Sequence, residues 1–91
     1  MVYVPDATAG DRELWKFSEG FYIKQQNDRW TERNNAGEVT FRFVETKRTD
    51  EFVELFDKNR NATIRLRLKM WMINQGDGKF EKLYEGGWAD K

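Results

Sequence analysis

Basic side chains recur at every second position in one segment of the second half of the chain. Arg65, Arg67 and Lys69 follow this spacing, and Trp71 continues it. In an extended strand such residues point to the same face, so the four are predicted to share one surface. A basic row that ends in an indole could contact phosphates and stack on a base. The interpretation that we favour is ion pairing with acidic residues of neighbouring strands, for which the candidates are Glu45, Glu51, Glu54 and Asp57.

Two aromatic rings are the best candidates for contact with a small ligand. The alternation in their segments places Trp71 and Tyr22 opposite the apolar face, which predicts that both rings are exposed. Rings flanked by amide side chains can stack on a sugar while the amides bond to its hydroxyl groups. The interpretation that we favour for Trp71 instead packs the ring against the far side of a closed barrel or against a partner subunit. The predicted ligand-binding residues are Trp71, Tyr22, Arg65, Arg67, Gln26 and Asn74.

Carboxylates suggest a third chemistry, the hydrolysis of glycosidic bonds. That reaction uses two carboxyl groups held at a fixed separation across a cleft. The candidates here are Glu45, Glu51, Glu54, Asp57 and Glu81. A domain of this size rarely forms a cleft deep enough to shift a carboxyl pKa, so we expect no enzyme activity. The spacing of the acidic residues does not match an EF-hand, and we expect neither a metal site nor a cofactor.

The composition excludes several classes of function. The 91 residues include no Cys and no His, which rules out disulfides, thiol chemistry and catalysis by an imidazole. Basic and acidic residues number 16 each, which argues against a nucleic-acid binder or a polybasic membrane anchor. The printed sequence contains neither a signal-peptide pattern nor an apolar run long enough to span a membrane. We therefore expect a cytoplasmic protein that does not contact membranes.

The segments that carry these residues are predicted to be β-strands. From Ile64 to Met72, apolar residues alternate without a break with Arg, Lys and one Trp, as in a long half-buried strand. Val39, Phe41 and Phe43 repeat the pattern. Polar and glycine-containing stretches separate the strands and indicate hairpins. About seven strands result, at 13–18, 21–26, 29–33, 38–46, 52–56, 63–73 and 79–85.

The segment 49–59 has two interpretations. As a short helix, it would have Thr49 at its N-cap and Phe52 and Leu55 on one face. As a strand, it would pair with the following strand across a polar turn and place Glu54 opposite Arg65. We favour the strand, because that pairing brings opposite charges together.

Several motifs in the chain form a recurring pattern. They are Trp-Thr-Glu at 30–32, Phe-Arg-Phe-Val-Glu at 41–45, Arg-Thr-Asp-Glu-Phe-Val-Glu-Leu-Phe-Asp at 48–57 and Leu-Tyr-Glu-Gly-Gly-Trp at 83–88. Over residues 13–88 the pattern resembles a group of small, aromatic-rich, largely uncharacterised all-β domains. The resemblance implies a strand at 52–56, and it carries no known activity or site residue.

The sequence thus predicts an all-β protein, a small antiparallel β-barrel or sandwich built from hairpins. Residues 13–88 form one domain, 1–12 a partly ordered N-terminal extension and 89–91 a tail. We expect a non-catalytic binding or protein-interaction module of otherwise unknown role. Its partner is unknown, and the alternatives are a second copy of the chain, a glycan or another small ligand, and, less favoured, a carboxylate-based hydrolase activity.

Overall fold

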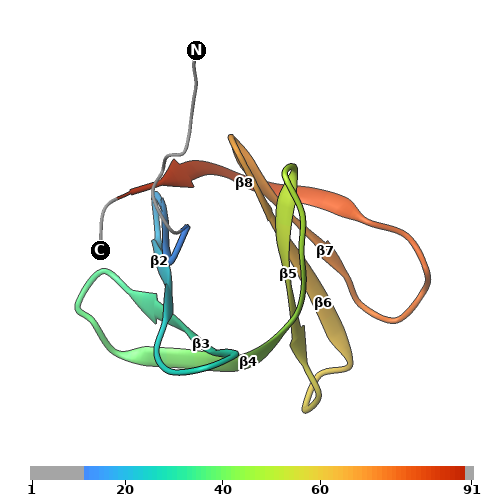
Figure 1. Ribbon diagram of the computed structural model, residues 1–91, viewed down its shortest axis with the longest axis horizontal. Coiled ribbons are helices and arrows are strands. Elements are labelled where there is room, and N and C mark those ends of the chain that lie inside the picture. The colour runs from blue at the N-terminus through green and yellow to red at the C-terminus, as the bar shows by residue number, and fades with distance from the viewer. Residues whose placement is uncertain (1–11, 90–91) are drawn as a thin grey trace.

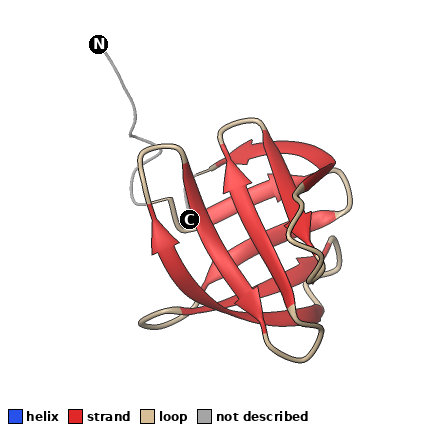
Figure 2. Ribbon diagram, turned by 90° about the vertical axis from the view of Figure 1, so that its right-hand side faces the viewer, coloured by secondary structure: helices blue, strands red, loops and turns tan. Residues whose placement is uncertain are grey.

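The protein is a closed barrel of eight antiparallel strands. The structure, a computed structural model, describes residues 12–89, and within that range it contains strands and no helix (Figure 2). Each strand pairs with the next along the chain, and β1 pairs with β8, which closes the ring (Figure 1). The prediction of a small all-β barrel is therefore confirmed. The strands are β1 (Leu14–Phe17), β2 (Gly20–Lys24), β3 (Arg29–Asn34), β4 (Val39–Arg48), β5 (Phe52–Asp57), β6 (Ala62–Arg67), β7 (Met70–Asn74) and β8 (Glu81–Trp88).

The up-and-down order places successive turns at opposite ends of the barrel. The β1–β2, β3–β4, β5–β6 and β7–β8 turns gather at one end, which we call the open end. The β2–β3, β4–β5 and β6–β7 turns lie at the other, which we call the closed end. Strand β1 starts and strand β8 finishes at the closed end. Between residues 12 and 89 no helix has the length and apolarity needed to cross a membrane.

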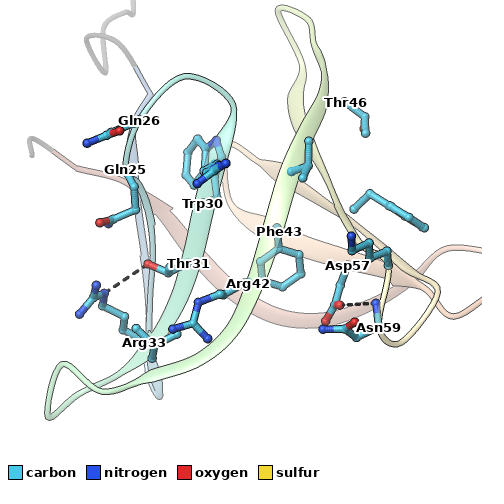
Figure 3. Close-up of a pocket in the computed structure, with 15 residues that line it drawn as sticks. Gln25, Gln26, Trp30, Thr31, Arg33, Arg42, Phe43, Thr46, Asp57 and Asn59 are labelled. Atoms are coloured by element: carbon cyan, nitrogen blue, oxygen red, sulfur yellow. Dashed lines mark hydrogen bonds between the residues drawn. The ribbon is translucent and has the colours of Figure 1, made fainter.

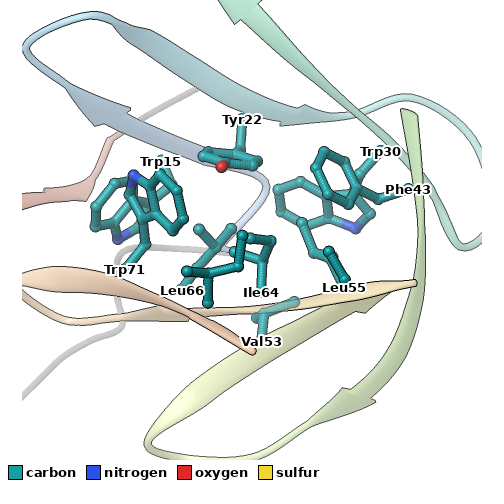
Figure 4. Close-up of a cluster of buried hydrophobic side chains, with 11 residues drawn as sticks. Trp15, Tyr22, Trp30, Phe43, Val53, Leu55, Ile64, Leu66 and Trp71 are labelled. Carbon is teal, nitrogen blue, oxygen red and sulfur yellow. The ribbon is translucent and has the colours of Figure 1, made fainter. Parts of the chain in front are cut away.

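Aromatic rings fill much of the barrel interior (Figure 4). Trp15, Tyr22 and Trp30 are almost completely buried, and they pack with aliphatic residues of β5 and β6. The indole Nε1 of Trp15 donates a hydrogen bond of 2.7 Å to the carbonyl oxygen of Arg67 across the interior. Large rings allow a chain of this length to bury a substantial apolar area with few residues.

Closure between β1 and β8 depends on a glycine. A Cβ atom on Gly86 would lie 2.6 Å from the Trp15 ring and would also collide with the carbonyl oxygen of Lys16. The missing side chain therefore makes room for the indole where the first and last strands pair.

The predicted long strand over 63–73 is divided in two. Strand β6 ends at Arg67, and Leu68 and Lys69 form a tight turn before β7. Leu66 then pairs directly with Trp71, and both side chains are buried. Leu68, expected on the apolar face, is 68% exposed. The prediction of one strand was wrong because neither turn residue is Gly, Asn, Asp or Pro, so nothing local marks the reversal.

The segment 49–59 forms a strand, as we favoured, and not a helix. Strand β5 pairs with β6, and Glu54 lies opposite Arg65 as predicted. Thr49 caps a turn instead of a helix, because its Oγ1 accepts hydrogen bonds from the backbone N–H groups of Glu51 at 3.1 Å and Phe52 at 3.2 Å. Apart from Arg12 and Ala89, the expected extension 1–12 and tail 89–91 lie outside the described residues.

Candidate functional site

The two rings predicted to be exposed are buried. Tyr22 is 0% exposed and Trp71 is 5% exposed, so the prediction that both offer a surface for stacking was wrong, whereas the favoured packing of Trp71 inside a closed barrel is confirmed. In β2 the inward positions are Gly20 and Tyr22, which leaves Phe21 and Ile23 half-buried on the outside. In β7 the turn at 68–69 exchanges the two faces relative to the single strand that we expected.

The two arginines of the predicted site lie on the outer face of β6 in ion pairs. Arg65 Nε is 3.0 Å from Glu54 Oε1, and an Arg67 terminal nitrogen is 4.0 Å from Glu51 Oε1. The Arg65 guanidinium also lies 4.5 Å from the centre of the Phe52 ring. For these two residues the favoured interpretation, pairing with acidic neighbours, is confirmed.

The structure does not bring the remaining predicted residues to the same place. Gln26 is exposed in the β2–β3 turn at the closed end, whereas Asn74 ends β7 at the open end. Asn74 has a role within its own turn, since its Oδ1 accepts hydrogen bonds from the N–H groups of Gly76 at 2.9 Å and Gly78 at 3.2 Å. The carboxylates considered for hydrolysis are also dispersed, and four of them hold ion pairs: Glu45, Glu51, Glu54 and Asp57.

Charged and aromatic side chains fill the closed end. Glu45 Oε1 lies 3.1 Å from Arg48 and 3.6 Å from Lys24, and it accepts a hydrogen bond of 2.9 Å from the Trp30 indole. Burial opposes ionisation of Glu45, but the hydrogen bonds from Arg48 and Trp30 and the nearby cations outweigh it and lower the pKa of this carboxyl. Trp88 packs edge-on against Trp30, with ring centres 6.5 Å apart. The carboxylate of Glu45 and the indole of Trp30 therefore satisfy each other at this end.

The open end contains a recess of about 340 Å³, which we call the mouth. Its inner wall is aromatic. Phe17 lies 5.1 Å from Tyr84 between ring centres, and Tyr84 lies 5.5 Å from Trp71. The lining residues are Phe17, Glu19, Glu32, Arg33, Asn34, Thr40, Phe41, Arg60, Trp71, Ile73, Gln75, Leu83 and Tyr84. Small-molecule sites commonly combine such apolar walls with a few polar groups.

Two carboxylates line the mouth without a cation partner. Among residues 12–89, neither Glu19 nor Glu32 has a basic nitrogen within 4.0 Å. Burial raises the pKa of Glu32, and this effect exceeds the opposing influence of Tyr22 and Arg60. The charge of Glu19 raises the pKa of the Tyr84 hydroxyl, with a smaller contribution from burial. Within residues 12–89, the open end thus holds two carboxylates outside any ion pair beside aromatic rings.

Two polar atoms next to the mouth are buried and make no well-formed hydrogen bond. They are the hydroxyl of Tyr22, which lies near the Glu32 carboxylate, and the indole nitrogen of Trp71. Burial raises the pKa of Tyr22 well above its ordinary value, and the charge of the nearby Glu32 adds to the increase. Unpaired buried polar groups are rare in folded proteins and are concentrated at functional sites.

One wall of the mouth already binds a cation from within the chain. The Arg60 guanidinium carbon lies 3.5 Å from the centre of the Phe41 ring. Its Nε is 2.6 Å from the Asp57 carboxylate, which is 2% exposed. In this arrangement one guanidinium is bound by both an aromatic face and a carboxylate. It is a cation–π contact supported by an ion pair.

Of the residues that line the mouth, only Trp71 was among the ligand-binding residues predicted from the sequence. One signal for Glu32 was available, because it follows Trp30 by two positions in the same strand and therefore shares its inward face. The same spacing relates Phe17 to Trp15 in β1. No comparable pattern identified Glu19 or Tyr84, which come together with Phe17 only when β1 closes against β8. Within residues 12–89, no group of three or more Asp or Glu side chains is arranged to hold a metal ion.

Comparisons with known proteins found no match for the chain. No family model matches it, and neither does any curated protein or solved structure. The resemblance to small aromatic-rich all-β domains therefore stays a prediction.

Proposed function

We propose that the protein is a non-catalytic binding module that takes a small organic cation into the mouth. The ligand would be an ammonium or amidinium group attached to an apolar or aromatic body. The observation that carries the proposal is the half-buried Glu32 carboxylate, which lines an aromatic recess without a cation partner among the described residues.

Burial of a carboxylate outside an ion pair costs free energy. Loss of hydration disfavours the ionised form of Glu32, and a bound cation would restore a favourable partner. The rings of Phe17, Trp71 and Tyr84 border the same recess, and aromatic faces attract cations and cover apolar groups. Arg60 on Phe41 provides a comparable arrangement within the chain itself.

Calorimetric titration with phenethylammonium tests the proposal. Phenethyl alcohol is the neutral control of the same shape, and we expect it to bind at least about tenfold more weakly. Glu32→Gln keeps the shape of the side chain but removes its charge, and we expect it to abolish this preference. The matched control is Glu51→Gln, because Glu51 lies in the β4–β5 turn at the closed end.

The pH dependence of binding provides a second test with a defined sign. The ionised form of Glu32 is the one that attracts the ligand, and the pKa of Glu32 lies above 4.5. Affinity should therefore rise with pH from about 4.5 until the raised pKa has been passed, and then level off. Equal binding of the alcohol and the ammonium compound, or an equal loss in Glu51→Gln, would show that Glu32 does not recognise a cation.

A further inference from the structure

A second recess lies on the outside of the barrel, where β3 and β4 meet the end of β5 (Figure 3). It has a volume of about 900 Å³, and we call it the outer groove. Strand alternation brings Arg29 and Arg33 of β3 and Arg42 of β4 to this surface, and Lys58 follows directly after β5. None of these four residues was predicted from the sequence to be a binding residue.

The outer groove concentrates positive charge that forms no ion pair within residues 12–89. Among the described residues, none of its four cations has a carboxylate within 4.0 Å. The groove's acidic lining residue is Asp57, whose buried carboxylate is paired with Arg60 instead. The whole chain is neutral, so this excess reflects a local separation of charge.

One of these cations is held in place by the fold. Arg33 Nε donates to Thr31 Oγ1 at 3.2 Å, as Figure 3 shows, and a terminal nitrogen donates to the Gly37 carbonyl oxygen at 2.9 Å. These bonds leave the guanidinium with further N–H donors for a partner. A guanidinium positioned in this way loses less conformational entropy when it binds an anion.

Apolar side chains lie between the cations. Arg29 pairs with Val44, and Val44 pairs in turn with Phe56, so the three side chains form one row across β3, β4 and β5. Val44 is 45% exposed. Charged and apolar contacts are therefore available side by side on the same surface.

We infer that the outer groove docks an acidic segment of a partner protein, one with apolar residues among its Asp and Glu side chains. The excess of positive charge calls for an anionic partner, and the Val44–Phe56 row suits the partner's apolar side chains. Nucleic acid fits less well, because the rings of Trp30 and Phe43 in the groove are buried and cannot stack on bases. A neutral chain also lacks the general attraction for phosphates that nucleic-acid binders use.

Fluorescence anisotropy at low ionic strength tests this inference. The probe is a labelled peptide of Glu-Leu-Asp repeats, and the matching neutral peptide has Gln-Leu-Asn repeats. The double variant Arg29→Gln with Arg42→Gln removes two exposed groove charges. The control double variant, Lys16→Gln with Lys69→Gln, removes two exposed charges elsewhere and changes the net charge equally. Circular dichroism confirms that both variants remain folded.

The expected result is binding of the acidic peptide that weakens at least about tenfold in the groove variant and less than about twofold in the control. Four results would overturn the inference. They are absence of binding to the wild-type protein, equal binding of the neutral peptide, equal losses in the two double variants, and tighter binding of a single-stranded oligonucleotide of the same charge. The last of these would identify the groove as a nucleic-acid surface.

Discussion

Replacing Tyr22 by Phe should stabilise the protein, although the residue is completely buried. The substitution removes a hydroxyl that makes no well-formed hydrogen bond, although the Glu32 carboxylate lies nearby, and it keeps the ring. An unsatisfied buried polar group costs about 1–3 kcal/mol, and deletion of a single oxygen atom leaves only a small void. Allowing for that void, we expect the free energy of unfolding to increase by about 1 kcal/mol. For a domain of this size this corresponds to a rise in Tm of about 4–8 °C.

Urea denaturation followed by circular dichroism measures the change, and Tyr22→Leu is the control for the ring. Loss of the ring removes its contacts with Trp15, Phe43 and Trp71, whose centres lie 6.3, 5.6 and 5.8 Å away. The Leu variant should therefore lose about 2 kcal/mol or more. If Tyr22→Phe were instead destabilised by about 1 kcal/mol, the hydroxyl must have a partner. The assignment of an unsatisfied polar group beside the mouth would then be wrong.

Two further substitutions test the open end and the closure of the barrel. Because the pKa of Glu32 is raised in the folded state, its contribution to stability is greatest below about pH 4.5 and is lost as the pH rises through the raised pKa. The urea midpoint of the wild type should therefore fall relative to that of Glu32→Gln as the pH rises above about 4.5, and a constant difference would contradict the raised pKa. Gly86→Ala should cost about 1–3 kcal/mol, because its methyl group would collide with Trp15. In the control Gly87→Ala the added atom would lie 3.5 Å from the Leu68 carbonyl oxygen, so equal losses would refute the steric argument.

Local pattern predicted the secondary structure well where charge and turn chemistry agreed. The pairing of β5 with β6 is the clearest case, because the polar turn and the facing charges of Glu54 and Arg65 both favoured a hairpin. The structure adds an ion pair between these side chains, with 3.0 Å between nitrogen and oxygen. Both signals act over a short stretch of chain, which is why sequence alone could reveal them.

Prediction failed at the two rings because alternation defines two faces without stating which one is inside. In β2, Phe21 and Ile23 lie on one face and Tyr22 lies on the other. Both faces therefore carry large side chains suited to a core, and either could have been buried. In β7 an unmarked turn changed the phase, and Trp71 moved from the expected surface to the core. Because Trp71 faces the core, the candidate site built on exposed rings does not exist. The strands themselves were correctly predicted to be extended.

The amino-acid sequence by itself determined that this chain forms antiparallel hairpins and that disulfide, thiol and imidazole chemistry are absent. Those conclusions depend on composition and on side-chain spacing along single strands. Only the tertiary structure decided that Glu19 and Glu32 both line a recess beside aromatic rings at one end, and that Arg29 and Arg33 of β3 and Arg42 of β4 share the outer groove. The physical reason is that the barrel closes only when β1 pairs with β8. Closure defines which face of each strand is inside and which turns lie together at each end.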